Sequence, residues 1–269
     1  MPMTKRLMIP LIGLLLALIA AGCGTRSAPI PTLIDIDASS TSVVLTQNAP
    51  PPGFDTVEFA DIDANLTRLP GWHYEATLSF SGYYARTTRE ATARTNAQVW
   101  YNQVASARRV VTQVSGDLQG NEQNTRYEAV RLGPDAFLLR DGTCLSNASE
   151  DAAFAADLSA ASLLGGIRTA QAAAEKAIIN DESVWRYTFS PDDVALPALA
   201  LAESGQITGI SGELWVSPEN NAVVRYYANI DFENGFLLGS SLPLTGTILL
   251  RYDLYDIGDV PNISVPFGC

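Results

Sequence analysis

Strict alternation of apolar and polar residues is the feature that most limits how this chain folds. From Ala222 to Phe232 every second residue is apolar, and Arg225 and Asp231 lie among the residues between. The same period of two recurs from Trp72 to Tyr84 and from Thr247 to Leu254. Because successive side chains of a β-strand point to opposite faces, each stretch predicts a strand with one buried face and one solvated face. Such strands are typical of antiparallel sheets and disfavour a doubly wound parallel sheet, whose central strands are apolar throughout.

Shorter stretches of the same kind extend the pattern. They lie at Ala93–Tyr101, Ala107–Val114, Thr125–Leu132, Ala136–Arg140, Trp185–Phe189 and Ile207–Val216. Turn-forming residues separate them, such as Gly133-Pro134-Asp135 and Asp141-Gly142. The sequence therefore predicts a long run of antiparallel strands.

An alanine-rich stretch from Ser149 to about Asn180 interrupts the strands and predicts helices. Ser149 suits the cap position, and Phe154, Leu158 and Ala161 share one helical face, which we expect to be buried. Gly165-Gly166 predicts the end of the first helix, with a further helical turn or two reaching Lys176.

A second helical start is marked by Ser190 as cap and Pro191 at the first helical position. Asp192 and Asp193 suit the first turn, and we expect the helix to continue towards Gly205 with an interruption at Pro197. Strands with short helices inserted before the last three predict an α+β domain over residues 55–269. Its expected form is a single curved antiparallel sheet, an open half-barrel, with short helices packed on the concave apolar face.

The first 22 residues have the composition of a secretory leader. Lys5 and Arg6 precede an apolar run of about 15 residues, Leu7 to Ala21, which is followed by Gly22 and Cys23. A permanent transmembrane helix is the weaker interpretation, because a helix needs about 20 apolar residues to cross the hydrocarbon core.

The segment Leu18-Ile19-Ala20-Ala21-Gly22-Cys23 resembles a bacterial lipobox, with alanine in place of the commonest leucine three residues before the cysteine. The resemblance implies that residues 1–22 are removed as a signal peptide and that Cys23 is diacylated. Two acyl chains hold a protein stably on a membrane. Residues 23–54, rich in serine, threonine and proline, are expected to form a flexible tether. We therefore expect an extracytoplasmic location on the membrane surface.

The chain is acidic, with a formal net charge of −12, and loss of Lys5 and Arg6 with the leader leaves −14. After the leader, Lys176 is the only lysine. Nucleic acids bind clustered basic residues, so a nucleic-acid partner is excluded. An anionic lipid surface repels such a chain, and attachment must therefore be hydrophobic.

Cys144 and Cys269 remain after the leader and form an even pair in an exported chain. This predicts a disulfide that holds the C-terminus, with a reactive or metal-binding thiol pair as the weaker alternative. His73 is the only histidine, so neither a metal site nor a serine-hydrolase triad has support. The carboxylate pairs Glu150-Asp151 and Asp192-Asp193 are better explained by helix starts. We expect no enzyme activity, no catalytic residues and no cofactor.

The layout also resembles a known family. The order of elements, the strand from Ile207 to Val216 followed by the strand Ala222–Phe232, and the closing residues Tyr252–Pro266 are similar to the lipoprotein-localisation carriers (LolA/LolB-like) and the mycobacterial lipid-carrying lipoproteins (LppX-like). The similarity covers roughly Asp55 to Pro266. It implies an open barrel closed by helices, with an apolar cavity that accepts acyl chains.

The strand faces that are apolar throughout supply six candidate ligand-lining residues, although core packing explains most aromatic residues. They are Leu78, Phe80, Tyr226, Ile230, Leu250 and Tyr252. The first hypothesis is a membrane-tethered carrier of a lipid or lipopeptide, enclosed by these strands and the helices of Ala152–Asn180. The alternative is a non-catalytic envelope scaffold with a filled core that binds another envelope protein.

Overall fold

The computed structural model describes residues 49–118, 122–146 and 148–269. They belong to one compact unit, Val44–Cys269. The leader, Cys23 and most of the expected tether lie outside the described residues. Within the described part, Phe54 packs against the core, and its carbonyl accepts a hydrogen bond from the Tyr187 hydroxyl at 2.7 Å.

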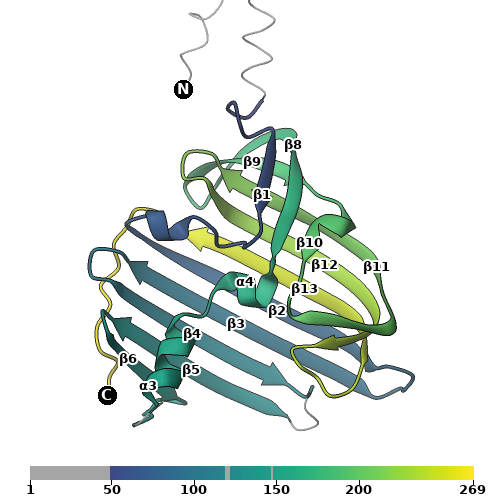
Figure 1. Ribbon diagram of the computed structural model, residues 1–269, viewed down its shortest axis with the longest axis horizontal. Coiled ribbons are helices and arrows are strands. Elements are labelled where there is room, and N and C mark those ends of the chain that lie inside the picture. Colours follow the sequence, from purple (N-terminus) through teal and green to yellow (C-terminus); the bar gives the residue numbers. More distant parts are fainter. Residues whose placement is uncertain (1–48, 119–121, 147) are drawn as a thin grey trace, which may run out of the picture. The chain divides into compact units, whose positions relative to one another are not determined.

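The described residues form one 13-stranded sheet, which is antiparallel throughout and curved, so that one of its faces is concave (Figure 1). Its strands are β1 Thr56–Phe59, β2 Gly71–Tyr84, β3 Glu90–Asn102, β4 Ala107–Gly116, β5 Gln123–Leu132, β6 Asp135–Arg140, β7 Thr143–Cys144, β8 Gly166–Ile179, β9 Glu182–Thr188, β10 Val194–Ala195, β11 Leu199–Ser217, β12 Ala222–Leu237 and β13 Leu244–Tyr255. The spatial order is β1-β8-β9-β11-β12-β13-β2-β3-β4-β5-β6-β7, with β10 beside β8. The two ends of this order do not pair with each other, so the predicted open half-barrel is confirmed.

The alternating residues place the core on one face of the sheet, as the sequence predicts. Tyr226 of β12 lies opposite Tyr252 of β13, and Ile230 lies opposite Ile248. All four side chains are fully buried. Burial of apolar surface at about 25 cal/mol per Å² makes this face the main source of stability. The register therefore follows from the period of two, since a shift by one residue would expose every core side chain.

Two α-helices, α3 (Ser149–Ala156) and α4 (Ala160–Leu164), lie over the concave face of the sheet (Figure 1). Helix α3 contacts β4, β5 and β6, while α4 contacts β2 and β13. Two short 3₁₀ turns, η1 (Leu66–Arg68) and η2 (Pro191–Asp193), complete the helical structure of the described residues. We call residues 148–165, which contain both α-helices, the lid.

The predicted face of the first helix is wrong at Phe154, which is 82% exposed. Helix α3 buries Ala152 and Ala156 instead, which lie one turn apart on the side that faces the sheet. Small side chains let the helix approach the strands closely. Ser149 is the first helical residue rather than the cap, a position that Ala148 occupies.

The prediction of helix beyond Gly165-Gly166 is also wrong. Gly166–Ile179 forms strand β8, which pairs with β1 on one side and with β9 on the other. Alanine favours helix by only about 0.5 kcal/mol per residue over most residues, so strand pairing and burial of Ile167 and Ala170 override that preference. The predicted helical cover over Ala152–Asn180 is therefore shorter than expected, because helical structure in this stretch ends at Leu164.

The second predicted helix is reduced to one turn. Ser190 and Asp193 form the capping box, in which the Asp193 carboxylate accepts from the Ser190 backbone N–H at 3.0 Å. Helical structure ends at Asp193, and Leu199–Ser217 forms the long strand β11. Pro197 stands between them and cannot continue a helix, since it has no N–H to donate.

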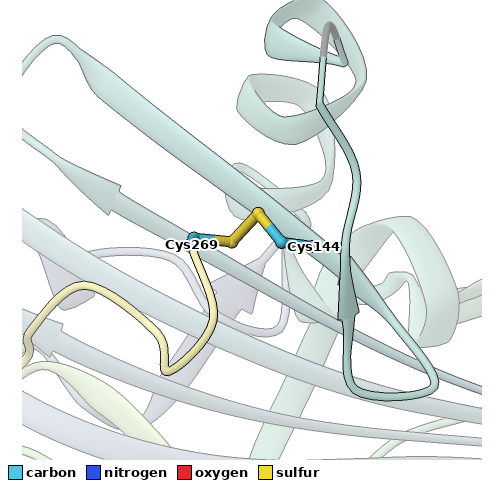
Figure 2. The surroundings of a disulfide bond; sticks show 2 residues. All are labelled: Cys144 and Cys269. Carbon is cyan, nitrogen blue, oxygen red and sulfur yellow. A yellow bond between two sulfur atoms is a disulfide. The ribbon is translucent and has the colours of Figure 1, made fainter.

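The predicted disulfide is confirmed. Cys144 and Cys269 are bonded, with 5.4 Å between their Cα atoms (Figure 2). The bond joins β7, at one end of the sheet, to the last residue of the chain. Among the described residues, no helix is both long and apolar enough to cross a membrane.

Candidate functional site

The six predicted ligand-lining residues lie together in the core on the concave side. Leu78, Tyr226, Ile230 and Tyr252 are fully buried, and Phe80 and Leu250 are each 3% exposed. They belong to a single cluster of buried apolar side chains. A ligand reaches them only if neighbouring side chains move, and their role in binding stays a prediction.

A groove opens on the same face of the sheet, at one end of β3, β4 and β5. Its volume is about 210 Å³. The lining residues are Ala93, Thr95, Val114, Ser115, Gly116, Leu118, Gln123 and Leu238. Ala93 and Thr95 alternate in register with the buried Ala97 and Val99, so the floor of the groove continues the core face. Leu118 and Leu238 pack against the core cluster.

A wider polar pocket of about 680 Å³ adjoins this groove and shares Ser115, Gly116 and Gln123 with it. Its other walls include Arg89, Asp117 and Glu122. The Asp117 carboxylate accepts from the Thr92 backbone N–H at 2.8 Å. The two spaces together present apolar and charged surfaces side by side, an arrangement suited to a molecule with an apolar chain and a polar end.

Polar side chains hold the lid on the sheet. The Asp63 carboxylate accepts hydrogen bonds from the backbone N–H groups of Ala160 at 2.8 Å and Ala161 at 3.3 Å. From the sheet, the Arg108 guanidinium donates to the Leu158 carbonyl at 2.6 Å. Arg131 forms an ion pair with Asp157, between the two helices. We call these contacts the latch.

Burial raises the pKa of Asp63 above its ordinary 3.8, although the two N–H groups and Arg108 oppose the shift. A carboxyl group with a raised pKa in the folded state binds its proton more readily there than in the unfolded chain, so its contribution to stability is lost as pH rises. We expect wild type to gain unfolding free energy relative to Asp63→Asn as pH falls from about 7 to about 4. Urea unfolding of both proteins across this range measures the difference, and a constant difference would contradict the assignment.

Two tyrosine hydroxyls in the core face have no hydrogen-bond partner among the described residues. They belong to Tyr226 and Tyr252, which are opposite each other on β12 and β13. Burial raises the pKa of both phenols, so both remain protonated at neutral pH. An unpaired buried hydroxyl costs roughly 1–3 kcal/mol.

Removing either hydroxyl is therefore expected to leave the stability of the protein unchanged or to raise it by about 1 kcal/mol. Tyr187→Phe is the matched control, because its hydroxyl donates to the Phe54 carbonyl at 2.7 Å. That variant is expected to lose about 1 kcal/mol. Urea unfolding of Tyr226→Phe, Tyr252→Phe and Tyr187→Phe tests the contrast, which fails if all three lose stability equally.

On the other face of the sheet, His73 is packed between rings rather than placed for chemistry. Its ring stacks on Trp100 at 4.6 Å between centroids and on Tyr255 at 5.6 Å. Burial lowers the pKa of His73, opposed by Glu75 and Asp256. Within the described ranges, no group of three His, Cys, Asp or Glu side chains is placed to hold a metal ion.

Sequence reasoning missed the latch and the groove. Asp63 and Arg108 look like ordinary surface charges in the sequence, and no local pattern connects them to residues about 50 or 100 positions away. Thr95 and Val114 lie on strands that the sequence predicts, and the structure places both on the core face. The alternation of residues along these strands could have assigned both side chains to the core face. No pattern in the sequence shows that this end of the sheet lies outside the lid.

No protein-family model matches the chain, and no curated protein matches it. Among solved structures the chain is similar to LprF from Mycobacterium bovis, with 12% identity, 75% of this chain and 93% of that chain covered, and a TM-score of 0.34. A LolA superfamily protein from Nitrosomonas europaea matches with 13% identity, coverage of 74% and 93%, and a TM-score of 0.19. A DUF1329 family protein from Desulfovibrio piger matches with 11% identity, coverage of 72% and 88%, and a TM-score of 0.19.

The sequence predicts a likeness to the LolA- and LppX-like carriers, and one of the similar solved structures is a LolA superfamily protein.

Proposed function

We propose that this chain is an exported lipoprotein, lipidated at Cys23, whose domain binds an amphiphilic ligand on the concave face of the half-barrel. The observation that supports ligand binding is the groove at Thr95 and Val114, which continues the core face and adjoins a polar pocket. The leader and the lipobox-like segment before Cys23 support the anchor. No step of covalent chemistry is required.

The ligand's apolar chain would lie in the groove and its polar end in the pocket beside Arg89. At about 210 Å³ the groove is smaller than the 300–1,000 Å³ of ordinary ligand sites, so a long chain needs further space. The lid covers the adjoining part of the concave face. In this proposal the latch opens to admit the rest of the chain, and apolar burial drives binding.

Native mass spectrometry of the protein purified from its membrane in detergent tests ligand binding. A mass excess that is lost on denaturation, and that appears as lipid in an organic extract, is the expected result. Equal native and denatured masses, still equal after incubation with lipids of the same membrane, would reject the proposal.

A pair of variants locates the ligand. Thr95→Trp fills the groove and is expected to reduce the bound lipid at least tenfold, while Arg94→Trp places the same ring on the opposite, exposed face of β3. The control is expected to keep its lipid. Equal lipid content in both variants would exclude the groove as the binding site.

The anchor has its own test. Cys23→Ser is expected to abolish incorporation of labelled fatty acid and to release the protein from the membrane fraction. If the Cys23→Ser protein still incorporates labelled fatty acid, Cys23 is not the site of lipidation and this part of the proposal is wrong.

The second candidate is an envelope scaffold with a filled core. The burial of all six predicted lining residues, none more than 3% exposed, favours it. It would be preferred if no lipid is extracted and a single envelope protein is enriched by capture of the wild-type chain.

A further inference from the structure

In the described part of the chain, strand β11 leaves one side unpaired over most of its length. At its two ends, β1 has 4 residues and β7 has 2, which keeps those edges short. Strand β11 differs: β12 pairs with it from Leu199 to Ser217, whereas β9 pairs with it only at Leu214, Trp215 and Val216. Among the described residues, no strand pairs with the other side of β11 between Leu199 and Glu213.

The part of this edge that follows the larger register shift is Gln206–Gly212. A register shift between Leu201 and Gln206 separates it from the start of the strand, and a one-residue shift lies at Thr208. The segment has no charged residue and no proline, in a chain of net charge −12. Natural proteins protect exposed edges with charges, prolines, β-bulges or short strands. Of these, Gln206–Gly212 has only the bulge at Thr208. Its free N–H and C=O groups are therefore suited to pair with another extended strand.

Apolar side chains lie beside this edge on the concave side. Ile207 is opposite the buried Phe232, and Ile210 is opposite the buried Ile230, so both belong to the core face. Ile207 is nevertheless 40% exposed. An added strand would continue the concave face and cover Ile207 with its own side chains.

We infer that Gln206–Gly212 pairs in antiparallel fashion with the same segment of a second copy of this chain, about a two-fold axis close to Gly209. An antiparallel edge is self-complementary. If residue i of one copy pairs with residue j of the other, then j of the first copy pairs with i of the second. The segment itself carries no charge, and the nearest carboxylate is that of Asp231 on β12, which lies 3.3 Å from the position of an added Cβ on Gly209. The concave faces of both copies would then join into one surface. This inference does not depend on the proposed ligand.

The oligomeric state of the full chain in detergent tests the inference. Size-exclusion chromatography with light scattering is expected to give the protein mass of a dimer for wild type. The double variant Ile207→Lys/Ser211→Lys places two cations on the edge of each copy and is expected to weaken association at least tenfold. Leu249→Lys is the matched control: its side chain is 48% exposed, but β13 is paired on both sides. The control is expected to remain dimeric.

Hydrogen exchange separates the remaining outcomes. In the dimer, the outward amides of Gln206–Gly212 are expected to exchange slowly, and in the double variant rapidly. Wild type that stays monomeric up to its solubility limit would overturn the inference. So would a dimer that survives both lysines, or a monomer whose edge amides are protected, since the edge would then be covered within one chain.

Discussion

Replacing Cys269 with serine is expected to lower the free energy of unfolding by about 4–5 kcal/mol in the chain-entropy treatment of a closed loop. The bond spans a sequence separation of 125, and a long loop loses much entropy in the unfolded chain when it is closed. The measured loss would be smaller where the unfolded chain keeps residual structure. Urea unfolding under non-reducing conditions, with wild type as reference, measures it.

The control for this prediction is Cys144→Ser/Cys269→Ser. The double variant is expected to lose the same free energy as either single variant, because one bond is removed in each case. If wild type keeps its stability under reducing conditions that break the bond, the disulfide does not stabilise the fold and the prediction is wrong.

Gly165→Ala is expected to lose about 3–5 kcal/mol, from backbone strain together with overpacking. Gly165 ends α4 with φ 75°, a value that favours glycine. An added Cβ would lie 1.6 Å from the Ala195 carbonyl oxygen, which cannot move without displacing β10 from β8. The lid and β8 would therefore separate at this point.

Gly239→Ala is the matched control, because Gly239 has φ +71° but nothing within 4 Å of an added Cβ. It is expected to lose only about 1–2 kcal/mol, the cost of the left-handed conformation. Thermal or urea unfolding of both variants measures the difference. Similar losses in the two variants would mean that the close approach to Ala195 contributes nothing.

The six predicted ligand-lining residues illustrate how far the sequence reaches towards a site. Alternation correctly places Tyr226 and Tyr252 on the buried face, as it does the other four candidates. It does not show that the lid leaves Thr95 and Val114 uncovered while burying Tyr252. That difference depends on where residues 148–165 cross the sheet. The crossing is held by Asp63 and Arg108, whose contacts are distant in the sequence.

The alanine-rich stretch shows the opposite case, in which a local pattern misleads. Residues 166–179 favour helix by composition, but β8 gains backbone pairing with two strands and buries Ile167. Local preferences differ by only fractions of a kcal/mol per residue, so tertiary pairing overrides them. The predicted cap at Ser190, by contrast, is correct, because its partner Asp193 is only three residues away.

By itself, the sequence determined the antiparallel strands, the face that each buries and the pairing of Cys144 with Cys269, since a period of two and a pair of cysteines are readable without coordinates. The tertiary structure alone decided that Gly166–Ile179 is a strand, that the lid ends at Gly165, and that Gln206–Gly212 is an open edge. The physical reason is the same in each case. These features depend on which distant segments approach closely enough to exchange hydrogen bonds and bury surface, and no local pattern of residues encodes that approach.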